Sequence, residues 1–369
     1  MTYHRLKLIL AAATILAGCH SGSNSKRTEI PSSNFVTAAA ETKPVPRDAA
    51  SDAADDPAIW INFSRPDSSR IIGTDKQGGL AVYDLSGHEL FYYPAGKMNN
   101  ADLRYHFALS KDTIDLLAVS NRTDQSVDLY KINTNGSLEV IHQQPLKSRL
   151  KEEVYGLCMY LSAKTGKYYV FVNGKDGAIE QWELFQVADQ ISGRIVRNLK
   201  LDTQVEGMVA DDEHGLLYVG EEKNGIWKFN AEPEGGDARE LLTRSTEKEN
   251  PYIAYDLEGM AIYKLQDGEG YLVTSSQGND SYALFERKPP HQYLGSFSIT
   301  DGIATDGTQD TDGLDLTSLP LGKDYPAGLL VVQDGKNKEA GVAAAQNFKL
   351  VRWDSISVKF NPVLNTNKP

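Results

Sequence analysis

The acidic stretch DAADDPAIW, residues 52–60, places Asp52, Asp55 and Asp56 directly before a proline and an apolar segment. Neighbouring carboxylates repel one another, so such an arrangement usually persists because a cation or hydrogen-bond donors neutralise it. A solvated acidic turn before a strand would explain a single stretch of this kind, since acidic residues are mostly exposed. The two interpretations differ in whether other parts of the chain bring carboxylates to the same place.

A polar residue, usually acidic, recurs before a small or apolar residue at the start of six predicted strands. The spacings are 46, 53, 51, 52 and 54 residues along the series Asp56, Asp102, Tyr155, Glu206, Glu258 and Asp312. Each is followed by a hairpin pattern such as IIGTDKQGGLAVYDL or LLYVGEEKNGIWKFN, with Gly, Asn, Asp and Lys in the turns. A repeat of this size without helical periodicity predicts an all-β fold, a six-bladed β-propeller, and a solenoid is the weaker alternative.

In a propeller, residues that begin the innermost strands meet at the mouth of the central channel, so the series predicts a ring rich in carboxylates. A second set in the hairpin turns should lie outside it on the same face: Lys76, Arg122, Lys175, Glu221 or Glu222, Gln277 and Asp334. Converging carboxylates without paired histidines suit Ca²⁺ and disfavour zinc. Cations beside such carboxylates suit an oxyanion with several charges, above all phosphate. The alternative is a solvated rim of strand-capping acids and turn lysines.

The N-terminus has the pattern of an export signal. Arg5 and Lys7 precede an apolar run, residues 8–17, and LAGC at 16–19 resembles a bacterial lipobox. We therefore expect a lipoprotein signal peptide over residues 1–18, lipidation at Cys19, and an anchor at the outer membrane or cell surface, or facing the periplasm; an ordinary signal peptide is the alternative. Residues 19–45 are predicted to be a flexible tether with one strand near Phe35, and residues 46–360 to be the propeller domain.

Composition limits the partners. A net charge of −12 argues against nucleic-acid binding through general electrostatics. No later segment reaches membrane-spanning length, so membrane contact is expected through the lipid alone. Cys158 is the other cysteine, which leaves no internal disulfide in the mature chain. One compact propeller can bury its core without a partner, and a monomer is expected.

From about Glu41 to Trp353 the chain resembles the β-propeller phytases, the calcium-dependent alkaline phytases of bacilli and many environmental bacteria. The motifs that carry the resemblance include DAADDPAIW, NNADLRYHF, EVYGL, EGMVADDEHGLLYVGEE, SSQGNDSYALFER and DGTQDTDGLD. The resemblance implies a phosphoric monoester hydrolase of the 3-phytase type. Its substrate would be phytate, myo-inositol hexakisphosphate, and several Ca²⁺ ions would stabilise the fold and assemble the site.

Residue roles follow from the resemblance motif by motif. It assigns the catalytic calcium cluster and its attacking water to Asp55, Asp56, Tyr155, Glu206, Glu222, Asp256 and Glu258. It assigns phosphate contacts to Lys76, Arg122, Tyr155 and Lys175, and further calcium sites to Gln277, Asp306, Asp312 and Asn337. This chain departs from the Bacillus members at Gln77, where they have a second lysine, and at Lys43, where they have a glutamate.

The mechanism expected from these residues is non-covalent. No Ser-His-Asp or Cys-His constellation and no histidine phosphatase signature is visible. Direct attack of a calcium-bound water on phosphorus, with Lys76 and Arg122 offsetting charge, is therefore expected, with a neutral to alkaline optimum. A calcium-dependent propeller lactonase or arylesterase is one alternative, although it does not explain Lys76, Arg122 and Lys175. A non-enzymatic surface binding module is the other, which fold alone does not exclude.

Overall fold

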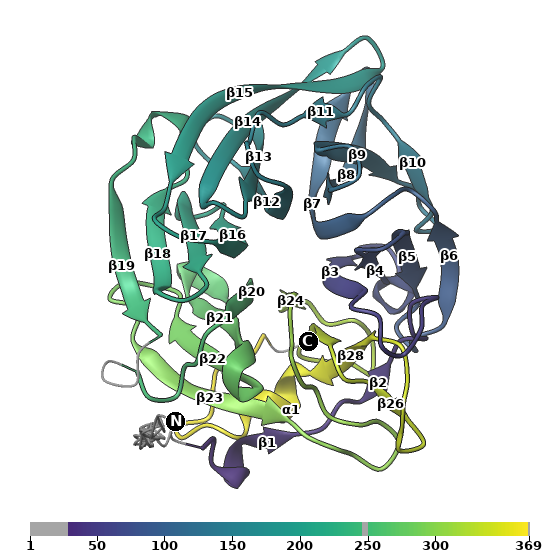
Figure 1. Ribbon diagram of the computed structural model, residues 1–369, viewed down its shortest axis with the longest axis vertical. Coiled ribbons are helices and arrows are strands. Elements are labelled where there is room, and N and C mark those ends of the chain that lie inside the picture. The colour runs from purple at the N-terminus through teal and green to yellow at the C-terminus, as the bar shows by residue number, and fades with distance from the viewer. Residues whose placement is uncertain (1–28, 246–249, 368–369) are drawn as a thin grey trace, which may run out of the picture.

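A computed structural model describes residues 29–245 and 250–367 of the chain. Within these ranges, six sheets of four or five strands form a closed ring, and the predicted six-bladed propeller is confirmed (Figure 1). The innermost strands β3, β7, β12, β16, β20 and β24 contact one another in turn around the centre. The predicted signal peptide and Cys19 lie outside the described residues.

Each blade is an antiparallel meander that follows the chain. The first blade contains β3 (Ala54–Trp60), β4 (Arg70–Asp75), β5 (Gly79–Tyr83) and β6 (Glu89–Tyr93). The second contains β7 (Met98–Leu109), β8 (Asp112–Asn121), β9 (Ser126–Ile132), β10 (Leu138–Val140) and β11 (Leu146–Lys147). The third contains β12 (Val154–Leu161), β13 (Tyr168–Gly174), β14 (Ala178–Val187) and β15 (Gln190–Lys200).

The remaining blades repeat this order until the last one. The fourth contains β16 (Val205–Asp211), β17 (Leu216–Glu221), β18 (Gly225–Asn230) and β19 (Arg239–Arg244). The fifth contains β20 (Leu257–Lys264), β21 (Gly270–Ser276), β22 (Ser281–Glu286) and β23 (Tyr293–Ile299). The sixth contains β24 (Leu314–Thr317), β25 (Leu329–Asp334) and β28 (Asn347–Arg352), with the small ribbon β26 (Lys338–Glu339) and β27 (Val342–Ala343) between the last two.

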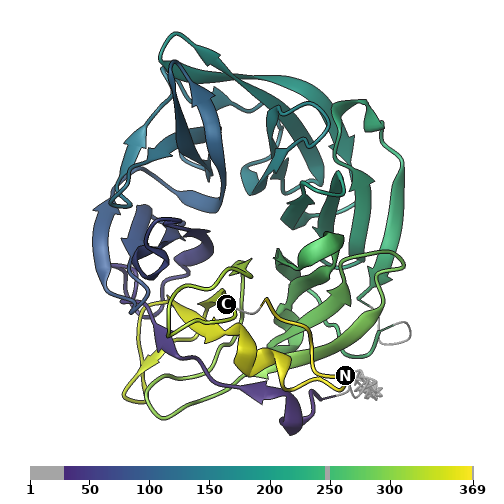
Figure 2. The ribbon, with the colours of Figure 1, turned by 180° about the vertical axis from the view of Figure 1, so that it is seen from behind.

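The N-terminal segment closes the ring. Strand β2 (Ala40–Glu41) pairs with β28 as the outermost strand of the sixth blade, and β1 (Phe35–Val36) pairs in parallel with β23 of the fifth. Figure 2 shows these purple strands beside the yellow C-terminal segment. The expected strand near Phe35 is thus present, and the sheets begin before residue 46, inside the stretch expected to be a tether. Pairing with a distant β28 could not be read from local composition.

Apolar side chains fill the space between neighbouring blades. Leu116 and Leu129 of the second blade, for example, pack with Val170 and Val172 of the third. Helix α1 (Trp353–Ser357) follows β28, and the indole of Trp353 is fully buried with its ring centroid 4.1 Å from that of Tyr263. No helix in the described part of the chain is long and apolar enough to cross a bilayer.

Candidate active site

In five of the six blades, the innermost strand begins with a β-bulge, and this bulge positions one side chain of the candidate site. Pairing with the next strand shifts register between Ala54 and Pro57, and the same shift recurs after Met98, Val154, Val205 and Leu257. The extra residues turn the strand and re-aim side chains at the channel mouth. The first residue of each bulge is, in blade order, Asp55, Asn99, Tyr155, Glu206 and Glu258. Asp312 precedes Gly313 and β24 in the sixth blade.

The predicted ring is therefore correct in four blades and wrong in the first two. Asp55 and Asn99, rather than Asp56 and Asp102, occupy the equivalent positions. Asp102 lies further along β7, where it accepts hydrogen bonds from Arg104 and from the Met159 amide at 2.8–3.0 Å. Asp56 is buried next to Asp55 and accepts a 3.0 Å hydrogen bond from the Ala101 amide. A repeat period alone leaves an error of one to three residues when the bulge is not known.

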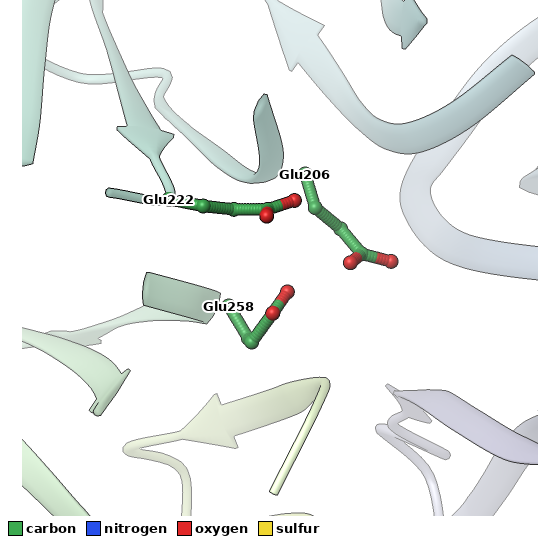
Figure 3. Close-up of side chains that lie close together, drawn as sticks. All are labelled: Glu206, Glu222 and Glu258. Carbon is green, nitrogen blue, oxygen red and sulfur yellow. The ribbon is translucent and has the colours of Figure 1, made fainter. Parts of the chain in front are cut away.

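Three glutamates converge at the centre of the mouth. Glu206, Glu222 and Glu258 are all buried, and each offers a carboxylate oxygen within 4.8 Å of the others (Figure 3). Glu206 and Glu258 begin innermost strands, whereas Glu222 follows β17 in the hairpin turn. This turn residue thus enters the ring itself, whereas the turn set was predicted to lie outside it, and Asp334, the turn member of the sixth blade, instead meets Lys349. Glu222 is the turn member in the fourth blade, because Glu221 is used by Trp227 and Thr203.

The cluster has oxygens without partners. Glu222 Oε1, Glu258 Oε2 and Asp256 Oδ1 are buried and make no hydrogen bond to any described residue. Burial and then Glu206 raise the pKa of Glu222 to about 7, and the same two causes raise the pKa of Glu258 well above its ordinary value. Burial likewise raises the pKa values of Asp55 and Asp56. Such a group of like charges needs either protons or a metal cation.

Lys76 lies at the edge of the ring and is surrounded by carboxylates. Its Nζ is 2.9 Å from oxygens of Asp55 and Asp312 and 2.8 Å from Asp52. Burial lowers the pKa of Lys76, but the three carboxylates outweigh it and raise the pKa above its ordinary value. Gln277 donates to the other Asp312 oxygen at 2.8 Å. The first predicted phosphate ligand is therefore at the mouth, but its ammonium contacts acids.

Arg122 and Lys175 lie together on the adjacent blades. Both stand over the ring of Tyr155, with Arg122 Cζ 5.9 Å and Lys175 Nζ 4.6 Å from its centroid. Burial, followed by Glu206 and Glu258, raises the pKa of Tyr155 above its ordinary value, so the phenol remains protonated. Cations and a neutral phenol donor therefore face the glutamate cluster across one mouth.

Two residues at this place were not predicted to have roles. Asn99 donates to Glu206 Oε1 at 2.8 Å and accepts from Arg122 at 3.1 Å. Glu153 accepts from Arg122 at 2.6 Å and lies 3.7 Å from Lys175. Asn99 is the first residue of the motif NNADLRYHF, and Glu153 is the first residue of EVYGL. Periodicity could have found Asn99, since it holds the ring position in its blade, but nothing local distinguishes Glu153 from its neighbour Glu152.

Asp306 and Asn337 do not lie in the glutamate cluster. Their side chains meet the fully buried ammonium of Lys349, together with Glu41 and Asp334. Lys349 supplies one positive charge to three carboxylates, those of Glu41, Asp306 and Asp334, and the buried Oδ2 of Asp334 accepts no hydrogen bond from a described residue. A calcium role for Asp306 and Asn337 therefore stays a prediction.

Lys43 and Gln77, the two residues that depart from the Bacillus pattern, lie outside the glutamate cluster. Lys43 pairs with Glu89 on the surface at 3.1 Å, while Glu41 supplies the carboxylate at Lys349. Gln77 donates to the carbonyl of Asp52 at 2.9 Å. Neither side chain contacts the glutamate cluster.

The family model described as Phytase matches residues 4–368. The chain belongs to the phytase family. A curated relative, the 3-phytase of Bacillus subtilis (strain 168), is 46% identical over 328 residues, which cover 87% of this chain and 84% of that protein. Family membership makes the chain a phytase, an enzyme that acts on a small phosphorylated substrate. The lactonase and the binding module find no support in these comparisons.

A solved structure similar to the chain is the Myceliophteria thermophila Cps50 (Swd1) β-propeller domain. It is 13% identical, with a TM-score of 0.43, over 80% of this chain and 82% of that one. This likeness is too weak to add to the fold, which is evident from the six sheets themselves.

Proposed function

We propose that this phytase is calcium-dependent and hydrolyses phosphomonoesters of myo-inositol hexakisphosphate by direct attack of water. The proposal rests on one observation, the arrangement of charged side chains at one mouth of the central channel. Buried carboxylates with unpartnered oxygens gather on the fourth and fifth blades, and Arg122, Lys175 and Lys76 face them from the first three. A substrate with several phosphates can meet cations directly and carboxylates only through metal ions.

The donor set fits calcium. The candidate ligands are oxygens from Glu206, Glu222, Asp256 and Glu258. Asp55 and Asp56 are the further candidates, since both feel the charge of Glu206. No histidine or cysteine is among these residues. Hard cations with flexible coordination prefer such oxygens, and an irregular channel mouth suits Ca²⁺ better than the strict octahedron of Mg²⁺. When bound, calcium would supply charge neutralisation and lower the pKa of an attacking water.

The chain's own residues would orient the ligands and the substrate. The Asn99 amide holds one oxygen of Glu206, and Gln277 holds one oxygen of Asp312. Arg122 and Lys175 would donate to phosphate oxygens, Arg122 with planar geometry. The protonated phenol of Tyr155 would donate a further hydrogen bond. Lys76 would exchange carboxylate partners for phosphate as negative charge accumulates on the substrate in the transition state.

Phosphate release from phytate by residues 29–369 tests this proposal, at about pH 7.5 with calcium added or chelated. Release that requires calcium is expected. Release that continues unchanged in excess chelator would contradict calcium dependence, and no release from folded, calcium-loaded protein would contradict the substrate.

We also propose that the chain is exported and anchored by a lipid on Cys19 at the cell envelope, and that the mature enzyme is a monomer. The order of basic start, apolar run and LAGC supports the anchor. Cys19→Ala should move the enzyme from the membrane fraction to the soluble fraction with its specific activity unchanged. A variant that stays in the membrane fraction would contradict the anchor.

A further inference from the structure

A carboxylate sits between the two cations that we propose to bind phosphate. Glu153 lies just before β12, and its Oε2 accepts a 2.6 Å hydrogen bond from Arg122 Nη2. The same oxygen is 3.7 Å from Lys175 Nζ. An anion at this point is unexpected in a site for a polyanion, because it competes with the substrate for the same donors. Its presence therefore calls for a function other than direct substrate contact.

Arg122 is held from a second side as well. Asn99 Oδ1 accepts from Nη1 at 3.1 Å, while Asn99 Nδ2 donates to Glu206. Asn99 and Glu153 thus fix both terminal nitrogens of the guanidinium. Its Nε is buried and has no hydrogen-bond partner among the described residues. The clamp sets the plane of the guanidinium and leaves a donor without a partner.

Arg122 and Lys175 would repel each other without Glu153. Both are long side chains, and ordering such a side chain carries an entropic cost that substrate binding would otherwise have to offset. The carboxylate cancels the repulsion and holds both cations above the face of Tyr155 before any substrate arrives. Preorganised donors lose less free energy on binding than mobile ones.

We propose that Glu153 is a positioning residue for phosphate recognition, which fixes Arg122 and Lys175 side by side in their binding geometry. This inference rests on the proposed phosphate-binding role of those two cations. Glu153 itself does not touch the reacting atoms; it acts through the groups that it holds.

The test compares Glu153→Ala and Glu153→Gln in the calcium-loaded chain, with Glu152→Gln as the matched control. Glu152 is the exposed neighbour, so its variant makes the same charge change without touching the cations. Steady-state kinetics with phytate give kcat and KM separately. Calorimetry with inorganic phosphate measures anion binding directly, and a calcium titration shows whether the carboxylate cluster is intact.

Glu153→Ala should raise KM and weaken phosphate binding by roughly tenfold, the effect of losing a charge-assisted hydrogen bond, with kcat changed by less. Calcium binding should be unchanged. Glu153→Gln keeps an acceptor for Arg122 and should recover part of the loss, while Glu152→Gln should behave as the parent. A purely structural role would instead reduce calcium binding or the unfolding temperature in parallel with activity, and that result overturns the proposal.

Arg122→Ala separates the remaining outcomes. If Arg122→Ala raises KM but Glu153→Ala leaves KM and phosphate affinity unchanged, or strengthens them, Glu153 does not position the cations. If Arg122→Ala also leaves phosphate binding unchanged, the failure belongs to the proposed function of the cations, and the inference about Glu153 falls with it.

Discussion

Glu206 links several residues of the mouth. It shares the cluster with Glu222 and Glu258, accepts from Asn99, and is a neighbour of Asp55 and Tyr155. Through Asn99 it is linked to Arg122. One side chain therefore joins the predicted metal ligands to the predicted phosphate ligands.

Glu206→Gln should lower kcat/KM for phytate by about a thousandfold or more, because it removes charge from the centre of the proposed metal site. The fold should persist, since an amide of the same shape relieves repulsion. Kinetics together with circular dichroism check this. Glu139→Gln, at an exposed position of β10, is the control. Near-parental turnover by a folded Glu206→Gln protein would contradict the assignment of Glu206 to the metal site.

The raised pKa values predict how stability depends on pH without calcium. A carboxyl whose pKa is raised by folding binds more protons in the folded state, so stability falls as pH rises between its unfolded and folded values. For Glu222 this window runs from 4.5 to about 7. Asp312, with a pKa raised to about 6 by burial, acts in the same direction. Asp211 and Glu221 have lowered pKa values, and their contributions are lost only at more acidic pH.

In excess chelator the unfolding temperature should therefore fall from pH 5 to pH 8. Calcium should reverse this trend, because deprotonated carboxylates bind metal more tightly as pH rises. Thermal unfolding at pH 5, 6, 7 and 8, with chelator and with calcium, measures both slopes. A chelated protein that becomes steadily more stable toward pH 8 would show that the glutamate cluster is not protonated as inferred.

The bulged strand start is the element that builds the site. A small residue follows the ring residue in four blades, and neighbouring blades come close to it. A Cβ added at Gly207 would lie 1.6 Å from the carbonyl oxygen of Glu258, and one at Gly156 would lie 1.9 Å from that of Glu206. Close approach of adjacent innermost strands thus requires glycine, and the same approach brings the glutamates together.

Gly207→Ala should destabilise the protein by roughly 1–3 kcal/mol, because backbone has to shift to admit the methyl group. Calcium affinity should fall as well, since the obstructed backbone carries Glu258. Chemical unfolding and calcium titration measure the two effects. Gly174→Ala is the steric control, with its nearest atom at an ordinary 3.4 Å. Parental stability and calcium affinity in Gly207→Ala would mean that the close approach is not needed.

At the scale of the whole molecule, the two ends of the chain close the ring. The sixth blade takes three strands from the C-terminal region and β2 from the N-terminal region. Val36 and Val45 are buried in this closure, and Glu41 partners the buried Lys349. Closure therefore combines strand pairing, apolar burial and neutralisation of a buried ammonium.

A chain that starts at residue 46 should unfold at a temperature lower by roughly 5 °C or more than one that starts at residue 29. It loses two strands, exposes the edge of β28 and leaves Lys349 without Glu41. Differential scanning calorimetry of both chains makes the comparison. Equal unfolding temperatures would show that the N-terminal strands contribute nothing to stability.

Much of the protein could be predicted from its sequence, because the signals involved are local. Alternating apolar residues and hairpin turns specify strands, and their recurrence about every fifty residues specifies the number of blades. Glu206, Glu258 and Tyr155 could be assigned to the mouth because a glycine follows each. Lys76, Arg122, Lys175 and Glu222 were placed there by their common phase in the repeat.

Tertiary structure decided what depends on distant partners. The bulge that puts Asp55 and Asn99 in the ring is defined by pairing with the next strand, so Asp56 and Asp102 looked equally suitable. Asn99 meets Glu206 across 107 residues, and Glu41 meets Lys349 across 308. Whether a carboxylate faces a lysine, an amide or other carboxylates is set by these long-range contacts, and that pairing determines which acidic residues are left for a metal.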